Sequence, residues 1–131
     1  MAADPEFLTV PRLHSGQVSA ANTNRDGTGT LVTIATGSGS YKEQIIHVAV
    51  IATVTTTAGM VRLFLSADGG TTKRLWDELP VAAVTVSATT PAFRTARHYN
   101  GLYLPDANAL LYASTHNAEA INVVASGLAT A

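Results

Sequence analysis

The sequence predicts an all-β protein with the strand spacing of a sandwich or barrel. Three observations indicate this. Turn-forming residues recur about every ten residues from position 29 onward. The segments between them are rich in Val, Ile and Thr, which suit a pleated sheet surface. No segment shows a sustained apolar period of 3.6 residues with helix caps, so we expect little helix.

The turn signals divide the chain into consecutive strand candidates. Asp68-Gly69-Gly70 is typical of a hairpin corner, and residues 22–29 form a cluster of turn-favouring Asn, Asp and Gly. The segment 81–86 fits either a weak strand or a long connection. We expect strands over residues 30–36, 42–55, 60–66, 72–79, 93–99, 108–115 and 120–126.

Residues 1–21 differ from the rest of the chain. Pro5 and Pro11 discourage regular structure, while four apolar residues offer anchors: Phe7, Leu8, Val10 and Leu13. We therefore expect an extended N-terminal arm or edge segment over residues 1–21, followed by one domain over residues 22–131. A chain of 131 residues that is 47% hydrophobic is long enough for a single buried core.

The strand candidate around Val50 is apolar on both of its faces. Simple alternation puts Ile46, Val48, Val50, Ala52 and Val54 on one face and Ile45, His47, Ala49 and Ile51 on the other. A strand with one wet face should instead alternate apolar and polar residues. We expect a cover over the outer face, and a folded-back arm and a partner subunit are equally good candidates.

Composition excludes several classes of partner. The net charge of −1 and scattered basic residues give no footprint for nucleic acid or an anionic membrane. No signal peptide is visible, and the longest apolar run is too short to span a bilayer. The absence of Cys excludes disulfides and thiolate chemistry and fits synthesis in a reducing cytoplasm.

No motif for catalysis or cofactor binding stands out. Asn22, Asn24 and Asp26 imitate the start of a calcium loop, but Thr33 stands where the pattern needs an acidic residue, so a turn is the simpler interpretation. The adjacent carboxylates of Asp77 and Glu78 point to opposite faces of a strand and cannot act as a pair. They suit surface charges that balance Lys73 and Arg74. We therefore expect no catalytic, cofactor or metal site and no enzymatic activity.

The four histidines also lack the spacing of a zinc site: His14, His47, His98 and His116. Trp76 and Phe64 are candidates for a platform that binds a carbohydrate or another ligand, since exposed rings can serve that purpose. Because only 6% of the residues are aromatic, each ring is a better candidate for core or interface packing.

Three runs of sequence resemble a family of small proteins encoded by tailed bacteriophages and prophages. They are AANTNRDGTGT at 20–30, TTTAGMVRLF at 55–64 and ASTHNAEAINVV at 113–124. The likeness covers about residues 7–127, and its motifs are turns and strand ends. The resemblance implies an antiparallel β-sandwich, jelly-roll-like, with about eight strands.

The resemblance also implies a structural role in the virion. Several small β-folds of this kind are capsid decoration (cement) proteins, commonly trimers on the major capsid lattice. We accordingly expect a homotrimer that binds the major capsid protein at the capsid surface. Tail, baseplate or head-fibre proteins, and a host-surface carbohydrate-binding module using Trp76 or nearby Tyr residues, remain alternatives. The expected contact residues are Phe7, Val10, Pro11, Arg12, Arg94 and Arg97.

Overall fold

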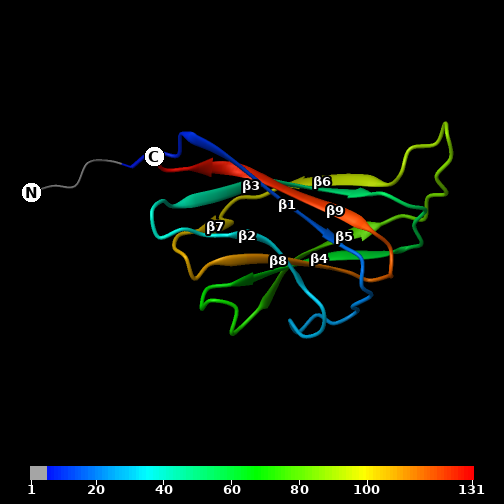
Figure 1. Ribbon diagram of the computed structural model, residues 1–131, viewed down its shortest axis with the longest axis horizontal. Coiled ribbons are helices and arrows are strands. Elements are labelled where there is room, and N and C mark those ends of the chain that lie inside the picture. The colour runs from blue at the N-terminus through cyan, green and yellow to red at the C-terminus, as the bar shows by residue number, and fades with distance from the viewer. Residues whose placement is uncertain (1–5) are drawn as a thin grey trace, which may run out of the picture.

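The protein consists of two β-sheets packed face to face (Figure 1). A computed structural model describes residues 6–131, and among these it contains strands and no helix. The strands are β1 (Val10–Val18), β2 (Val32–Thr36), β3 (Glu43–Ala52), β4 (Gly59–Ser66), β5 (Arg74–Val81), β6 (Arg94–His98), β7 (Tyr103–Leu104), β8 (Leu110–Thr115) and β9 (Ile121–Ala129).

The strand order is that of a jelly roll, which confirms the predicted fold class. Sheet A has the order β1-β9-β3-β6, with the short β7 also paired to β3, and sheet B has the order β2-β8-β4-β5. The antiparallel pairs β1–β9, β2–β8, β3–β6 and β4–β5 are nested one inside the next. This nesting is what results when one long hairpin is rolled into two Greek keys.

The core lies between the two sheets and is built from alternate residues of each strand. In sheet A the inward residues include Val48, Val50 and Val123, all fully buried. Sheet B contributes Val61, Leu63 and Leu111, which are buried to the same degree. Branched side chains project from the inner face of each pleated sheet and interdigitate with those of the other sheet. The two inner faces therefore form the whole core.

A β-bulge changes the alternation predicted for β3. The register with β9 shifts between Ile45 and His47, so Ile45 faces the core and is fully buried, whereas Ile46 is only half-buried. Val54 lies beyond the end of the strand and is exposed. The predicted assignment of Ile45 and Ile46 to faces is therefore wrong, because an extra residue in a bulge reverses the alternation beyond it.

The N-terminal segment is an integral part of sheet A. Residues 1–21 were expected to form an arm or edge segment, and Val10–Val18 form the edge strand β1, paired with β9 along its whole length. Residues 10–18 therefore belong to the sandwich, so residue 21 does not separate an arm from the domain. Residues 1–5 lie outside the described residues.

Most predicted strands are confirmed with small shifts of their ends. The hairpin corner at Asp68-Gly69-Gly70 connects β4 and β5, and both glycines have positive φ. β5 continues through Pro80 to Val81. Proline has no N–H to donate, but β5 is an edge strand, so the sheet has no further strand that would need this hydrogen bond. Residues 82–86 form a connection, with one bridge between Thr56 and Val84. β1 and β7 were not predicted as strands.

Gly127 permits the close approach of β9 to the bulge in β3. A Cβ atom at this position would lie 1.9 Å from the carbonyl oxygen of Gln44. We expect Gly127→Ala to destabilise the protein by about 1–3 kcal/mol, because backbone atoms cannot yield as a flexible side chain would. A thermal melt should show a midpoint lower by roughly 4–12 °C.

Gly39→Ala is the matched control. A Cβ at Gly39 meets nothing within 4 Å, so its melting midpoint should equal that of the wild type. Equal midpoints for both variants would show that the Gly127 contact does not constrain the fold.

Candidate functional site

The outer faces of the two sheets differ in how they are covered. On sheet B, Arg62 and Phe64 point away from the core, yet only 2% and 0% of their surface is exposed. The connection from β1 to β2 covers this face. Its Asn22 backbone pairs with Thr115 of β8, and its Gly27 lies against the carbonyl group of Lys73 near β5.

Internal hydrogen bonds give this covering loop its shape. The Asn22 side chain donates to the carbonyl oxygens of Thr28 (3.0 Å) and Thr30 (2.9 Å). Asp26 accepts from the backbone N–H of Thr28 (3.1 Å) and from its hydroxyl group. The residues that imitate a calcium loop therefore bond to the loop itself, as in the turn interpretation.

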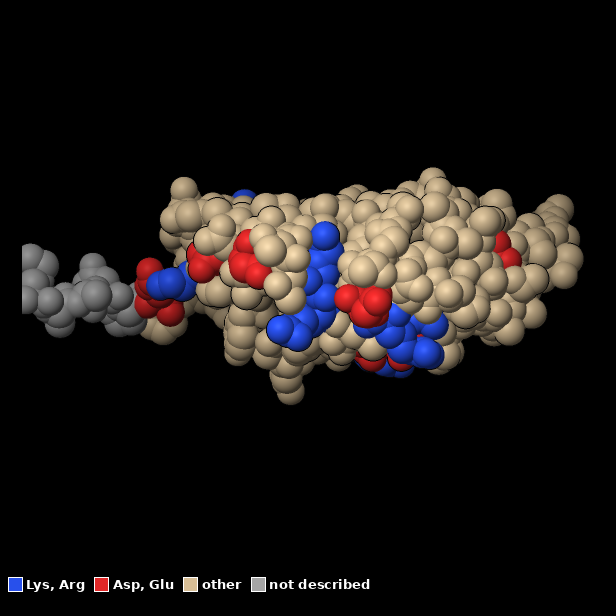
Figure 2. Space-filling model, turned by 90° about the horizontal axis from the view of Figure 1, so that it is seen from below, with Lys and Arg blue, Asp and Glu red and all other residues tan. Residues whose placement is uncertain are grey.

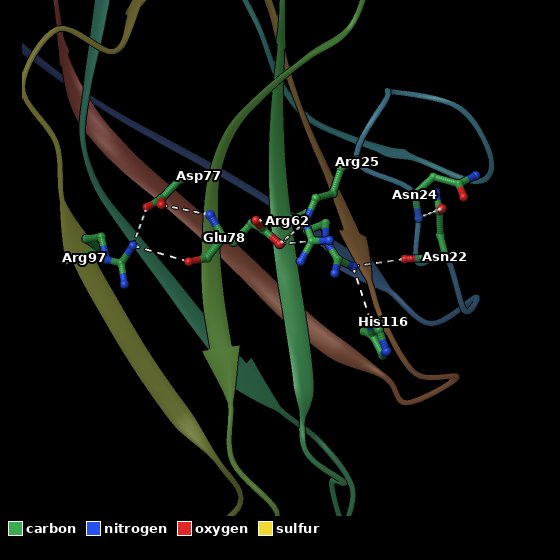
Figure 3. Close-up of polar contacts among 8 residues, drawn as sticks. All are labelled: Asn22, Asn24, Arg25, Arg62, Asp77, Glu78, Arg97 and His116. Carbon is green, nitrogen blue, oxygen red and sulfur yellow. Dashed lines mark hydrogen bonds and ion pairs between the residues drawn. The ribbon is translucent and has the colours of Figure 1, made fainter.

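An ion-pair network attaches the loop to sheet B (Figure 3). Arg62 Nε donates to Glu78 Oε2 at 2.9 Å, and Arg25 of the loop donates to the same carboxylate. Arg62 also donates to His116 Nδ1 (3.3 Å), which must accept because a guanidinium group has no acceptor. Burial alone would raise the pKa of Glu78, but hydrogen bonds from Arg25 and Arg62 hold it below its ordinary value.

A second polar group connects the edges of the two sheets. Asp77 of β5 accepts from Arg97 of β6 (2.7 Å) and from the Tyr99 hydroxyl group (2.8 Å). Burial alone would raise the pKa of Asp77, but these hydrogen bonds and the charge of Arg97 hold it below its ordinary value. Burial, followed by the hydrogen bond to Asp77, raises the pKa of Tyr99. Asp77 and Glu78 thus pair with arginines that are distant in sequence, not with Lys73 and Arg74.

The outer face of sheet A is the candidate functional site. Cross-strand register puts one set of residues on this face. In successive rows they are Pro11, Leu128, Gln44 and Tyr103; Leu13, Ser126, His47 and His98; Ser15, Val124, Ala49 and Ala96; and Gln17, Asn122, Ile51 and Arg94. We call this set the outer face of sheet A, and among the described residues no loop comparable to 22–30 lies over it.

This face contains almost no charge. It includes no Asp, Glu or Lys, and Arg94 at one corner is its only arginine. The rings of His47 on β3 and His98 on the edge strand β6 lie against each other on this face, with centroids 4.8 Å apart. Leu13 is 72% exposed, the highest value among the large hydrophobic residues described. By contrast, the side seen in Figure 2 shows acidic and basic groups next to one another.

The predicted contact residues lie in different places. Pro11 and Arg94 belong to the outer face of sheet A, at opposite corners. Val10 and Arg12 have the inward register, and the Arg12 guanidinium lies 3.9 Å from the centroid of the Tyr41 ring. Arg97 also has the inward register, opposite Val48, and pairs with Asp77. Phe7 precedes β1 and is 68% exposed.

Sequence reasoning did not identify Leu13, His47 and His98 as part of one surface. The sequence marks Leu13 only as an apolar residue of the N-terminal segment, and it gives no spacing that connects His47 with His98. Their adjacency depends on the β1–β9–β3–β6 register, which joins residues more than 80 positions apart. Period-two alternation of Pro11, Leu13 and Ser15 was the only local signal.

Residues 6–131 contain no group of three or more His, Cys, Asp or Glu that could hold a metal ion. They also contain no helix long and apolar enough to cross a membrane. No protein-family model matches the sequence, and no curated protein is significantly similar to it.

The network around Glu78 gives a prediction on stability. Glu78→Gln should cost about 2–3 kcal/mol in the free energy of unfolding, because it leaves the buried Arg62 charge without its partner. Arg25→Gln removes only the exposed member and should cost less than about 1 kcal/mol. Urea denaturation of both variants measures the difference; equal losses would contradict the central role of Arg62.

The lowered pKa of Asp77 predicts an acid-dependent stability. The carboxyl group of Asp77 stays ionised to a lower pH in the folded protein than in the unfolded chain. Its contribution to stability is therefore complete above the unfolded pKa of about 4 and is lost as the pH falls through the pKa of the folded state. Asp77→Asn should show a shallower loss of stability in urea titrations between about pH 6 and pH 2. Parallel curves for variant and wild type would contradict this.

Proposed function

We propose that this protein is a non-enzymatic structural component of a tailed-phage virion, a capsid decoration protein that binds the major capsid lattice and stabilises the head. The observation that carries the proposal is the outer face of sheet A. It is nearly uncharged, lies on a rigid sheet and has no covering loop among the described residues. The phage-family resemblance of the sequence supplies the class of partner.

The two sheets differ in how their outer faces are covered, and this difference supports an interface on sheet A. The chain uses a loop and two arginines to cover one outer face. Of the two covers that the sequence suggested for β3, a folded-back arm requires residues 10–18, which form β1 instead. That leaves a partner subunit as the better explanation for the apolar outer side of β3.

The size of the face favours an oligomer. Strands about 4.8 Å apart and about eight residues long at 3.3 Å per residue give a four-stranded face of roughly 500 Å². A specific interface commonly buries about 800 Å² per partner. One face alone is therefore small, and a homotrimer that presents three such faces would gain affinity through multivalency. Phe7 and Leu8, both exposed beside the edge strand, can extend the contact.

A position in the tail, baseplate or a head fibre is the alternative within the same class. It would use the same face but a different partner. Copy number separates the two, because a decoration protein should approach the abundance of the capsid subunit. Electron microscopy of purified particles gives the position directly, and density confined to the tail would exclude the capsid role.

The interface itself can be tested with a charge substitution. Leu13→Glu places a carboxylate on the outer face of sheet A at a site that is 72% exposed, so the fold should be unaffected. We expect the occupancy of the variant on particles lacking the wild-type protein to fall at least about tenfold, because docking would desolvate the new charge. Quantitative gel analysis of particles after sedimentation measures the bound protein.

Thr23→Glu is the matched control, since Thr23 is exposed on the loop over sheet B, away from this face. Its occupancy should equal that of the wild type. Light scattering of the purified protein tests the trimer, and monomers alone at high concentration would contradict self-assembly away from the capsid. Full occupancy of Leu13→Glu would eliminate this face as the interface.

A further inference from the structure

We propose that a pocket beside the edge strand β5 binds a neutral saccharide. The pocket has a volume of about 570 Å³, within the usual range for small-molecule sites. It lies between the β4–β5 hairpin and the segment 101–109. Its chemically distinctive lining residues are Trp76, Tyr103, Leu75, Arg74, Asp68 and Asp106.

A second β-bulge brings Leu75 and Trp76 to the same pocket. Asp77 pairs with Leu63 and Leu75 pairs with Phe64, so Trp76 is the extra residue of the bulge. Regular alternation would send Leu75 and Trp76 to opposite sides, yet both line the pocket and each is 36% exposed. Bulges at sheet edges commonly redirect side chains at binding sites.

The Trp76 ring packs against Tyr99, which does not line the pocket. Its centroid lies 6.1 Å from that of Tyr99, at an angle of 57° between the rings. The Tyr99 hydroxyl group donates to Asp77 at 2.8 Å, and Arg97 donates to the same oxygen. The ion pair thus fixes Tyr99, and Tyr99 limits the movement of Trp76. A ring held in place loses less entropy when a ligand stacks on it.

The hairpin side of the pocket is also held in one conformation. Ser66 Oγ donates to Asp68 Oδ1 (2.8 Å) and accepts from the backbone of Gly70 (2.9 Å). Asp68 Oδ1 accepts from Thr72 N–H as well (2.9 Å). Among the described residues, Oδ2 of Asp68 and Oδ2 of Asp106 form no hydrogen bond, and Arg74 forms no ion pair. Acceptors and donors are therefore available around the aromatic surface.

This combination matches the chemistry of a neutral sugar. A pyranose ring has an apolar C–H face, which can stack on Trp76 or the 56%-exposed Tyr103, and hydroxyl groups at its rim. Carboxylate oxygens accept hydrogen bonds from hydroxyl groups, and a guanidinium group donates to them. Two carboxylates against one arginine disfavour an anionic sugar. Tyr103 lies where the pocket meets the outer face of sheet A, but the saccharide site does not depend on a role in the virion.

Trp76 provides a direct measurement because it is the only tryptophan in the chain. The purified full-length protein is titrated with methyl glycosides of glucose, galactose and mannose, with neutral linear oligosaccharides and with purified neutral bacterial polysaccharide. N-acetylneuraminic acid and a neutral tetrapeptide are comparators. We expect a saturable change in Trp76 fluorescence and in its indole N–H NMR signal below about 20 mM for at least one neutral saccharide, a range that includes weak millimolar binding. Binding of the small glycosides would indicate a free sugar as the ligand, whereas binding of the polysaccharide alone would indicate a cell-surface source.

Two variants locate the site. Tyr103→Ala should weaken binding at least about tenfold while leaving the Trp76 reporter in place. Leu13→Ala, which removes a more exposed apolar side chain from β1, a strand that does not line the pocket, should bind as the wild type does. If Tyr103→Ala fails to fold, Asp106→Asn takes its place. The proposal is overturned if no neutral saccharide gives a saturable change, if only the acidic sugar or the peptide does, or if the substituted protein binds unchanged.

Discussion

The ion pair between Arg62 and Glu78 determines which face of the sandwich is open. A two-layer β-fold has two outer faces, and each must be solvated, covered or bound by a partner. Arg62 is buried on the outer side of sheet B, where its charge would be costly without Glu78. Arg25 joins the same carboxylate and brings the loop with it. Sheet B is thereby covered, whereas the exposed Leu13 on sheet A and the pocket beside β5 are open to solvent.

Local sequence patterns were sufficient for the fold class and for most strands. Val, Ile and Thr between Gly- and Asn-rich turns predicted β2, β4 and β8 within a few residues, because those signals depend on neighbours in sequence. β1 was recognised only as an arm or edge segment. Pro11 argued against a strand at this position, because proline is rare within strands. The partner strand β9 lies at the other end of the chain. Nothing local encodes such a distant pairing.

The candidate sites were harder to predict because bulges and edges control them. One inserted residue in β3 exchanged the faces of Ile45 and Ile46, and one in β5 turned Trp76 into a pocket already lined by Leu75. Arg97 on an edge strand bends toward Asp77 of the other sheet. Alternation predicts a face only until the first irregularity. The lack of apolar–polar alternation in β3 is the local pattern from which a cover over its outer side is predicted.

The pairing of β1 with β9 also brings the two ends of the described chain together. Thr9 donates its backbone N–H to Ala129 at 3.0 Å, and Figure 1 shows both ends at one end of the molecule. A short linker could therefore close the backbone into a ring. New ends could then be opened in the exposed connection at 87–91, which lies outside every sheet. The nested hairpin would keep its pairing while its chain order changed, so the sandwich is well suited to circular permutation and to carrying a fused cargo at that end.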